Sequence, residues 1–201
     1  MRHLFARRRR GRGQSLAEFT LILPIIMTLT LTIAEFGVAF GTNMTMVEAT
    51  REGARTGAVL VDGSKALGCG SLTGDAYVDP QIIAAVQRAI ESPGSGISIS
   101  HVDYIHIFKA DANGNETSSV NVWKPWSAGH PTTTICGVTL DFYQYSNNWP
   151  ASTRANILPV DSIGVSIQYE YQPFTPLSAL TRLVGLSQIT MVDSTVMAFE
   201  P

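Results

Sequence analysis

The sequence lacks the residue patterns on which most enzyme chemistry depends. It has no glycine-rich phosphate loop and no His-Glu-x-x-His pair, and its two cysteines have no cysteine or histidine at zinc-ligand spacing. Nothing specifies the geometry of a Ser/His/Asp triad, and the candidate Asp193 lies in the middle of a predicted strand. We therefore expect a protein that is not an enzyme and that has no metal or cofactor site.

Two polar clusters come closest to a ligand site. Asp111, Asn113 and Asn115 alternate like calcium ligands, but the loop's glycine precedes the third ligand and no acid follows at the required place. We expect a hairpin turn there instead. His101 and His106 lie an odd number of residues apart on one predicted strand, so they point to opposite faces and cannot share a metal or a proton.

Positive charge is concentrated at one end of the chain. Of 14 basic residues, six lie in the first 13 positions, which hold no acid, so the rest of the chain has 8 basic residues against 16 acidic ones. Such a remainder repels phosphate, which excludes nucleic acid as a partner. The basic cluster instead indicates a positive-inside signal that keeps the N-terminus in the cytoplasm. A disordered basic tail is the alternative.

A long apolar stretch follows the basic cluster. Residues 19–47 contain one charged residue, Glu35. In a helix, Gln14 and Glu35 would be about 31 Å apart, which is close to the hydrocarbon thickness of a bilayer. We therefore expect a membrane-spanning helix in which Glu18 is the acid that lies within the membrane. The stretch is too long, and lacks a clear cleavage site, for an ordinary secretory signal.

Three residues of this helix, Pro24, Gly37 and Gly41, have special backbone properties. A proline inside a helix removes one backbone hydrogen bond, and we expect a bend at Pro24. Gly37 and Gly41 form a GxxxG pattern, through which two helix backbones can approach each other closely. Short patterns of this kind also arise by chance, so both interpretations stay open.

Beyond Gly41 the pattern becomes amphipathic, and we expect one continuous helix from about residue 15 to residue 58. Gly53 and Gly57 indicate either close packing against the following domain or fraying at the helix end. The block at residues 51–55 has two interpretations, contact with a partner protein or docking of the helix on its own sheet. The candidate contact residues are Arg51, Glu52, Gly53 and Arg55.

The remaining chain predicts an antiparallel α+β domain. A helix begins with Asp79 as N-cap and ends at Pro93. Period-two patterns predict strands over residues 101–109, 119–124, 132–145, 162–171 and 188–199. In the first strand one face carries Val102, Tyr104, His106 and Phe108. In the fourth strand the inward residues are Ile163, Val165, Ile167, Tyr169 and Tyr171. A short helix is expected to begin at Thr175.

Cys69 and Cys136 both fall in the part expected outside the membrane. Two cysteines in an exported domain indicate one disulfide, which would stabilise the fold by about 4 kcal/mol in the chain-entropy model. Two buried free thiols are the alternative.

The joint between the basic cluster and the helix carries the most specific pattern. Gly13 is followed by Gln14, by a carboxylate at Glu18 and by an aromatic at Phe19. With Leu23-Pro24, the 51–55 block and the terminal Glu-Pro, this pattern resembles the TadE-like family, the minor pseudopilins of the tight-adherence (Flp, type IVc) pilus system. The resemblance is strongest over residues 11–58, weaker at 169–176 and at the C-terminus, and slight in between.

The resemblance implies that the chain is the substrate of an enzyme, a prepilin peptidase that cuts between Gly13 and Gln14. The cut leaves a positive α-amine on Gln14, one helical turn from Glu18, and pairing would neutralise two charges that are costly in a low-dielectric setting. The implied partners are the peptidase, other pilins and pseudopilins, the inner-membrane assembly platform and membrane lipid. N-methylation of Gln14 would keep the charge, whereas cyclisation to pyroglutamate would delete it.

The expected organisation is a leader at residues 1–13, a helix segment at 14–58 and an extracytoplasmic domain at 59–201. The chain would cross the cytoplasmic membrane once and enter a surface pilus. One alternative is an uncleaved, signal-anchored protein with a ligand-binding outer domain, which predicts that Glu18→Ala has no effect. Another is a tethered exported enzyme, which predicts a convergent polar pocket.

Overall fold

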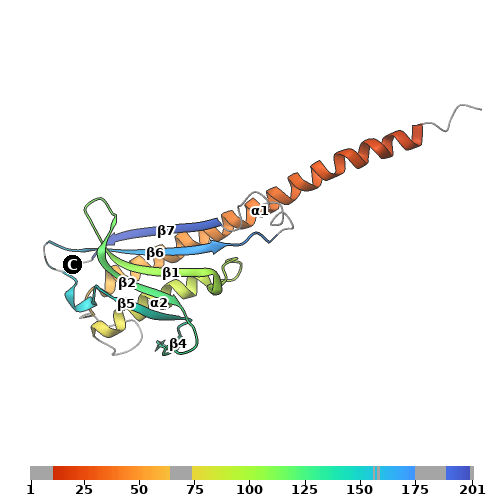
Figure 1. Ribbon diagram of the computed structural model, residues 1–201. Coiled ribbons are helices and arrows are strands. Elements are labelled where there is room, and N and C mark those ends of the chain that lie inside the picture. Colours follow the sequence, from red (N-terminus) through yellow and green to blue (C-terminus); the bar gives the residue numbers. More distant parts are fainter. Residues whose placement is uncertain (1–10, 64–73, 156, 158, 175–188, 200–201) are drawn as a thin grey trace, which may run out of the picture. The chain divides into compact units, whose positions relative to one another are not determined.

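A computed structural model of the chain describes residues 11–63, 74–155, 157, 159–174 and 189–199 (Figure 1). These residues fall into two compact units. The first contains the chain up to Val38 together with Pro173 and Phe174, and the second begins at Ala39. Helix α1, Gly11–Leu60, is one continuous helix of 50 residues that belongs to both units. It begins and ends slightly outside the limits predicted from the sequence.

The second unit is built on a five-stranded antiparallel sheet with the strand order β5-β2-β1-β6-β7. Its strands are β1 (Val102–Ala110), β2 (Glu116–Pro125), β5 (Phe142–Asn147), β6 (Ser162–Tyr171) and β7 (Ile189–Ala198). Helix α2 (Val78–Ile90) and the C-terminal part of α1 lie behind this sheet in the view of Figure 1. A long apolar helix followed by a domain with an antiparallel sheet confirms the predicted α+β class.

The hydrophobic core lies between the helices and one face of the sheet. The inward residues predicted for the strand at 162–171 are all buried, and this strand has the predicted limits. They pack with apolar side chains of α1, α2 and β1, among them Met46, Ala49, Ile82, Ile83, Val86, Ile105 and Ile107. Full burial of one such branched side chain contributes about 1.5–3 kcal/mol, so this layer holds the second unit together.

Two glycines bring α1 close to its neighbours. A Cβ atom added at Gly53 would lie 2.6 Å from Cγ2 of Val86, and one added at Gly57 would lie 2.5 Å from Cδ1 of Ile163. No side chain fits at either position without movement of the neighbour, and the helix continues past both glycines to Leu60. Close packing, rather than fraying of the helix end, is therefore the role of these glycines.

The β1–β2 hairpin has the turn predicted at residues 111–115. Oδ1 of Asp111 accepts hydrogen bonds from the backbone N–H groups of Asn113 and Asn115, both at 2.8 Å. These bonds, first of all the one from the Asn115 backbone, stabilise the ionised carboxylate and lower the pKa of Asp111 below its ordinary value of 3.8. The cluster that resembled calcium ligands thus works as a turn.

The start of β1 differs from the prediction. Val102 pairs with Tyr169 and Tyr104 pairs with Gln168, so β1 has one residue more than β6 between the two pairs. This bulge shifts the alternation by one residue. Val102 is therefore buried in the main core with the isoleucines of β1, and the prediction that it shares a face with Tyr104 was wrong.

The single strand predicted over residues 132–145 was also wrong. The structure has a separate two-stranded sheet, β3 (Thr134–Ile135) and β4 (Val138–Thr139), followed by β5. Cys136 and Gly137 form the turn between β3 and β4 with positive φ angles of 54° and 76°. A non-glycine residue rarely takes such a φ, so a sequence pattern does not reveal it. Cys69 lies outside the described residues, and its disulfide with Cys136 stays a prediction.

The predicted N-cap of α2 was wrong as well, because Asp79 has a tertiary role. The helix begins at Val78 with no side-chain cap at Tyr77. The two Asp79 carboxylate oxygens instead accept hydrogen bonds of 2.6 Å each, from Arg154 Nη2 and from Asn121 Nδ2. All three side chains are buried, so the ion pair anchors α2 to the loop after β5. The helix expected from Thr175 lies outside the described residues.

Candidate functional site: the exposed surface of α1

The two residues of the predicted charge pair lie on one face of the first unit's helix. Nε2 of Gln14 donates a hydrogen bond of 3.0 Å to Oε1 of Glu18, the i, i+4 arrangement that brings side chains together. Gly13 precedes them in helical conformation, and a Cβ atom there would have nothing within 4 Å. The residues on both sides of the predicted cut are thus open to solvent in the described structure.

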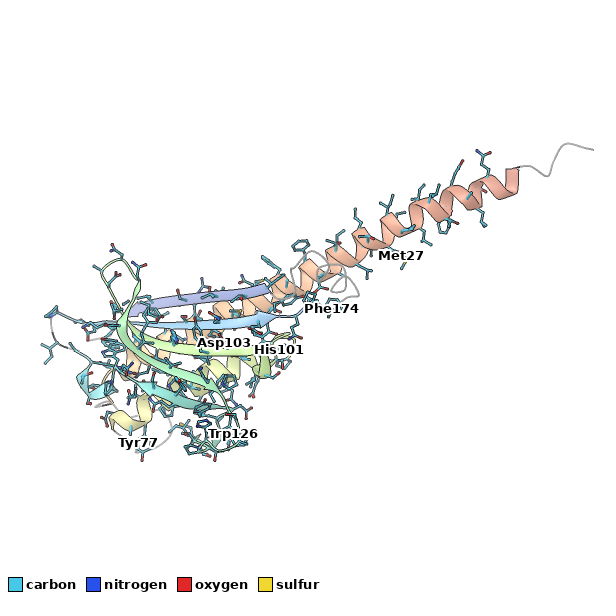
Figure 2. The ribbon with its side chains drawn as sticks, in the orientation of Figure 1. Met27, Tyr77, His101, Asp103, Trp126 and Phe174 are labelled. Carbon is cyan, nitrogen blue, oxygen red and sulfur yellow. The ribbon has the colours of Figure 1, made fainter. Side chains whose placement is uncertain are left out.

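Helix α1 presents apolar side chains around its whole circumference in the first unit. They include Leu16, Phe19, Leu21, Ile22, Leu23, Ile25, Ile26, Met27, Leu29, Ile33 and Phe36, exposed by 38% to 75%. Met27 projects freely from the helix in Figure 2. The most apolar 18-residue window of α1 has a mean hydropathy of 2.0 with none of it buried. The helix therefore has the length and composition needed to cross a membrane.

The hydroxyl groups of this apolar helix are bonded within the helix. Thr20, Thr28, Thr30 and Thr32 each donate from Oγ1 to the carbonyl oxygen four residues earlier, at 2.7–2.9 Å. A hydroxyl group without a partner is costly in hydrocarbon, and these bonds remove that cost. The helix continues through Pro24, whose own carbonyl accepts the bond from Thr28. The threonines are thus compatible with a lipid environment.

Glu35, the second acid of the helix, also has a hydrogen-bond partner within the first unit. Its Oε1 accepts a bond of 3.2 Å from the backbone N–H of Phe174. Gly37 and Gly41 are open, with nothing within 4 Å of a Cβ atom added at either position. The structure therefore leaves the GxxxG pattern accessible, and its role in helix packing stays a prediction.

The 51–55 block divides into two sides. Gly53 is buried and faces Val86 of α2 and Val165 of β6. Arg51, Glu52 and Arg55 are exposed on the other side of the helix. The two interpretations of the block therefore concern different residues. Docking on the protein's own sheet involves Gly53, and contact with a partner stays a prediction for the three charged residues.

A contact that sequence reasoning missed holds α1 to the edge of the sheet. Oγ1 of the buried Thr50 donates to Oδ2 of Asp193 at 2.5 Å and lies 3.0 Å from Oγ1 of Thr195. Both partners are on β7, about 143 residues away in the sequence. Asp193 was considered only as a member of a triad, and it works instead as an anchor for the helix. No local pattern signals a pair so distant in the chain.

The two histidines considered as a pair have separate neighbours. His106 stacks on Tyr104 with ring centroids 4.0 Å apart, and its Nδ1 lies 3.0 Å from Glu116. His101 lies in a short 3-10 turn and meets the ring of Tyr169 at 6.2 Å. Burial, and then the negative charge of Glu116, raise the pKa of the Tyr104 hydroxyl above its ordinary value of 10.0.

Comparison with known proteins finds a family similarity for the segment that carries these features. Residues 13–55 match the family model described as TadE-like protein. The searches of curated proteins and of solved structures found no significant match. The matched segment begins at Gly13, includes the whole apolar stretch and ends at Arg55, which agrees with the resemblance noted in the sequence. Residues 13–55 of this chain are therefore similar to the TadE-like family, which is associated with Tad pili.

Proposed function

We propose that this protein is a minor pseudopilin that a prepilin peptidase cuts between Gly13 and Gln14 and that takes part in assembling a type IVc (Flp/Tad) pilus. The observation that carries the proposal is the placement of Gln14 one turn before Glu18, with their side chains in contact at 3.0 Å. An acid at this point of an apolar helix needs a partner, because a lone carboxylate costs about 2.5–3.5 kcal/mol in a membrane.

Cleavage supplies a stronger partner than the uncut chain has. Before the cut, the nitrogen of Gln14 is a peptide nitrogen, and Glu18 has the neutral side-chain amide as donor. After the cut, Gln14 carries a positive α-amine near the same carboxylate, on its own chain or on a neighbouring pilin. Hydrogen bonds between ionised groups are roughly twice as strong as neutral ones. Processing is thereby coupled to assembly, since an uncut chain lacks the amine.

The start of α1 is suited to peptidase access. A protease acts on extended backbone, so the first turn has to unwind around the bond after Gly13. Gly11 and Gly13 lie in that turn, and each glycine lowers helix stability by about 1 kcal/mol relative to alanine. The turn therefore opens at low cost, while the apolar helix after it stays intact.

The remaining elements have roles that follow from this placement. The arginines before Gly13 hold the N-terminus in the cytoplasm, and the second unit faces outward. Gly37 and Gly41 let a neighbouring helix approach, and Pro24 adapts the helix to its neighbours. A disulfide between Cys69 and Cys136 strengthens the outer domain. The partners are the peptidase, other pilins, the assembly platform and lipid, and the protein itself catalyses no reaction.

The pair is tested by replacing Glu18 with glutamine in cells that make the pilus. Glu18→Gln keeps the size of the side chain and removes its charge, so we expect normal cleavage and loss of pilus assembly. The matched control is Glu35→Gln, which removes the other acid of the same apolar stretch and should leave assembly intact. Normal pili with Glu18→Gln would contradict the proposal and favour an uncleaved anchor.

A further inference from the structure

We propose that exposed aromatic rings at the end of the β2–β5 pair bind an uncharged polysaccharide chain. The surface, called the aromatic patch below, consists of Lys124 near the end of β2, Trp126 and His130 in the loop after β2, and Tyr143 and Tyr145 on β5. Neither the processing of the leader nor the charge pair of α1 involves these residues, so the inference goes beyond the proposed function.

The side chains of the aromatic patch form one connected cluster. The ring of His130 stacks on that of Tyr143, with centroids 3.7 Å apart and an angle of 12° between the planes. Nε1 of Trp126 donates a hydrogen bond of 3.1 Å to the backbone oxygen of His130. Lys124 pairs with Tyr143 in the ladder, and its Nζ lies 4.4 Å from the ring centroid of Tyr145. Single apolar side chains are ordinary on a surface, whereas a contiguous patch of them marks a binding site.

These contacts orient the rings without burying them. Trp126 is 44% exposed and Tyr145 is 62% exposed. Tyr145 is the extra residue of a β-bulge, because it lies between the two β5 residues that pair with Val122 and Trp123. Bulges at sheet edges re-aim side chains, and β5 is an edge strand. Rings that are already held in place lose less conformational freedom when a ligand binds.

The surroundings of the rings carry almost no net charge. Residues 124–150 contain one basic residue, Lys124, and one acidic residue, Asp141, whereas the chain after Gly13 has 8 basic residues against 16 acidic ones. Nucleic-acid bases also stack on aromatic rings, but their binding needs a basic groove along the phosphates. The composition of this stretch therefore favours an uncharged ligand.

The chemistry around the rings favours a ligand rich in hydroxyl groups. The large exposed hydrophobic residues of this stretch are the aromatic Trp126 and Tyr145, while its aliphatic Ile135 and Leu140 are buried. Residues 124–150 also contain nine Ser, Thr, Asn or Gln residues. The C–H bonds on one side of a pyranose sugar fit against the negative face of an aromatic ring. The hydroxyl groups at the rim of the sugar can then bond to neighbouring hydroxyl and amide groups.

The aromatic patch is longer than a single sugar ring. Trp126 lies close to the β3–β4 hairpin (Figure 2), and its backbone N–H donates to the backbone oxygen of Asp141 at 2.8 Å. Tyr145 lies four residues further along the same strand, which corresponds to about 13 Å of extended chain. An extended sugar chain therefore fits better than a monosaccharide. A β-1,4-linked chain of glucose presents C–H faces along its whole length.

The test measures binding of cellohexaose, a neutral β-1,4-linked glucose hexasaccharide, to the full chain by saturation-transfer NMR. The protein is kept in micelles of a detergent without a sugar head group. We expect saturable binding in which the ring C–H protons of the sugar receive the saturation. Trp126→Ala and Tyr145→Ala should each weaken binding about tenfold, since each removes one stacking ring. Tyr145→Phe should keep the affinity, whereas Tyr145→Leu, which is apolar but not aromatic, should not.

The matched control is Tyr77→Ala, which removes a tyrosine that is 41% exposed in the short 3-10 helix η1 (Asp75–Tyr77), outside the aromatic patch, and should leave the affinity unchanged. A β-1,4-linked glucuronic acid hexasaccharide should bind more weakly than cellohexaose, because the domain is acidic.

Three results would overturn the inference. They are no saturable binding of cellohexaose, full binding by Tyr145→Leu, and stronger binding of the charged hexasaccharide. Binding of hexaproline in place of the sugar would also overturn it and would assign the aromatic patch to a protein segment. The chain with its leader should bind cellohexaose as well as the cut chain, so failure of this test leaves the proposed processing untouched.

Discussion

Replacement of Gly53 by alanine should weaken the second unit although alanine favours helices. In a helix interior, alanine is about 1 kcal/mol better than glycine. The new methyl group, however, would lie 2.6 Å from Cγ2 of Val86 and 3.2 Å from Cγ1 of Val165. Valine is branched at Cβ, which gives Val86 one strongly preferred rotamer in helix α2 and restricts χ1 of Val165 in strand β6, so neither neighbour turns away without cost. Overpacking of this kind costs about 1–3 kcal/mol, and we expect a net loss of up to about 2 kcal/mol.

Two other glycines of the same helix provide graded controls. At Gly57 the closest atoms are Cδ1 of Ile163 at 2.5 Å and Cδ1 of Ile82 at 3.0 Å. These are the ends of flexible side chains, so Gly57→Ala should be close to neutral. At Gly41 nothing lies within 4 Å, so Gly41→Ala should gain up to about 1 kcal/mol from helix propensity.

The assay is urea unfolding of the full chain in detergent micelles, followed by tryptophan fluorescence. Trp123 and Trp149 are buried in the second unit and report its unfolding. The expected order of stability is Gly41→Ala, then Gly57→Ala, then Gly53→Ala. If Gly53→Ala were as stable as Gly41→Ala, the close approach of α1 to α2 and β6 would not exist as described.

Two further predictions concern the domain's polar groups. Asp79→Ala leaves the buried Arg154 without its countercharge, so urea unfolding should show that the free energy of unfolding falls by about 3–5 kcal/mol. The double variant with Arg154→Met should recover part of this loss. A loss below about 1 kcal/mol would contradict the buried pair. The carboxyl of Asp111 should titrate below 3.8 by NMR. Because the folded pKa of Asp111 is lowered, its contribution to stability is present above pH 3.8 and is lost as the pH falls through the folded pKa. This contribution should be absent in Asp111→Asn. A measured pKa at or above 3.8 would contradict the turn.

The parts of the fold that were predictable are those whose pattern is local. Strand β6 has the predicted limits because large apolar residues occupy every second position of its sequence. These residues form the inward side, which packs against two helices. The glycines in α1 signalled close packing, although sequence alone could not separate packing from fraying. The Val102 bulge and the β3–β4 turn were missed, because one extra residue or one positive φ at Cys136 changes the pattern without a compositional signal.

The candidate site was predictable for a different reason. Gln14, Glu18 and the apolar stretch lie within one helix, so their relation follows from helix geometry alone. The contacts that hold the helices to the rest of the domain do not follow from local geometry. Asp79 looked like a helix cap because its preference for that position is strong, yet its partner Arg154 is 75 residues away. Thr50 and Asp193 are paired across a still greater separation, and only the folded structure brings them together.

The central claim is that proteolysis creates the countercharge of Glu18, and the mass of the N-terminus tests it most directly. In protein extracted from membranes of cells that make the pilus, we expect a chain that begins at Gln14 with a free or methylated α-amine. A chain that still carries residues 1–13, or a functional one whose Gln14 is fully cyclised and uncharged, would contradict the account.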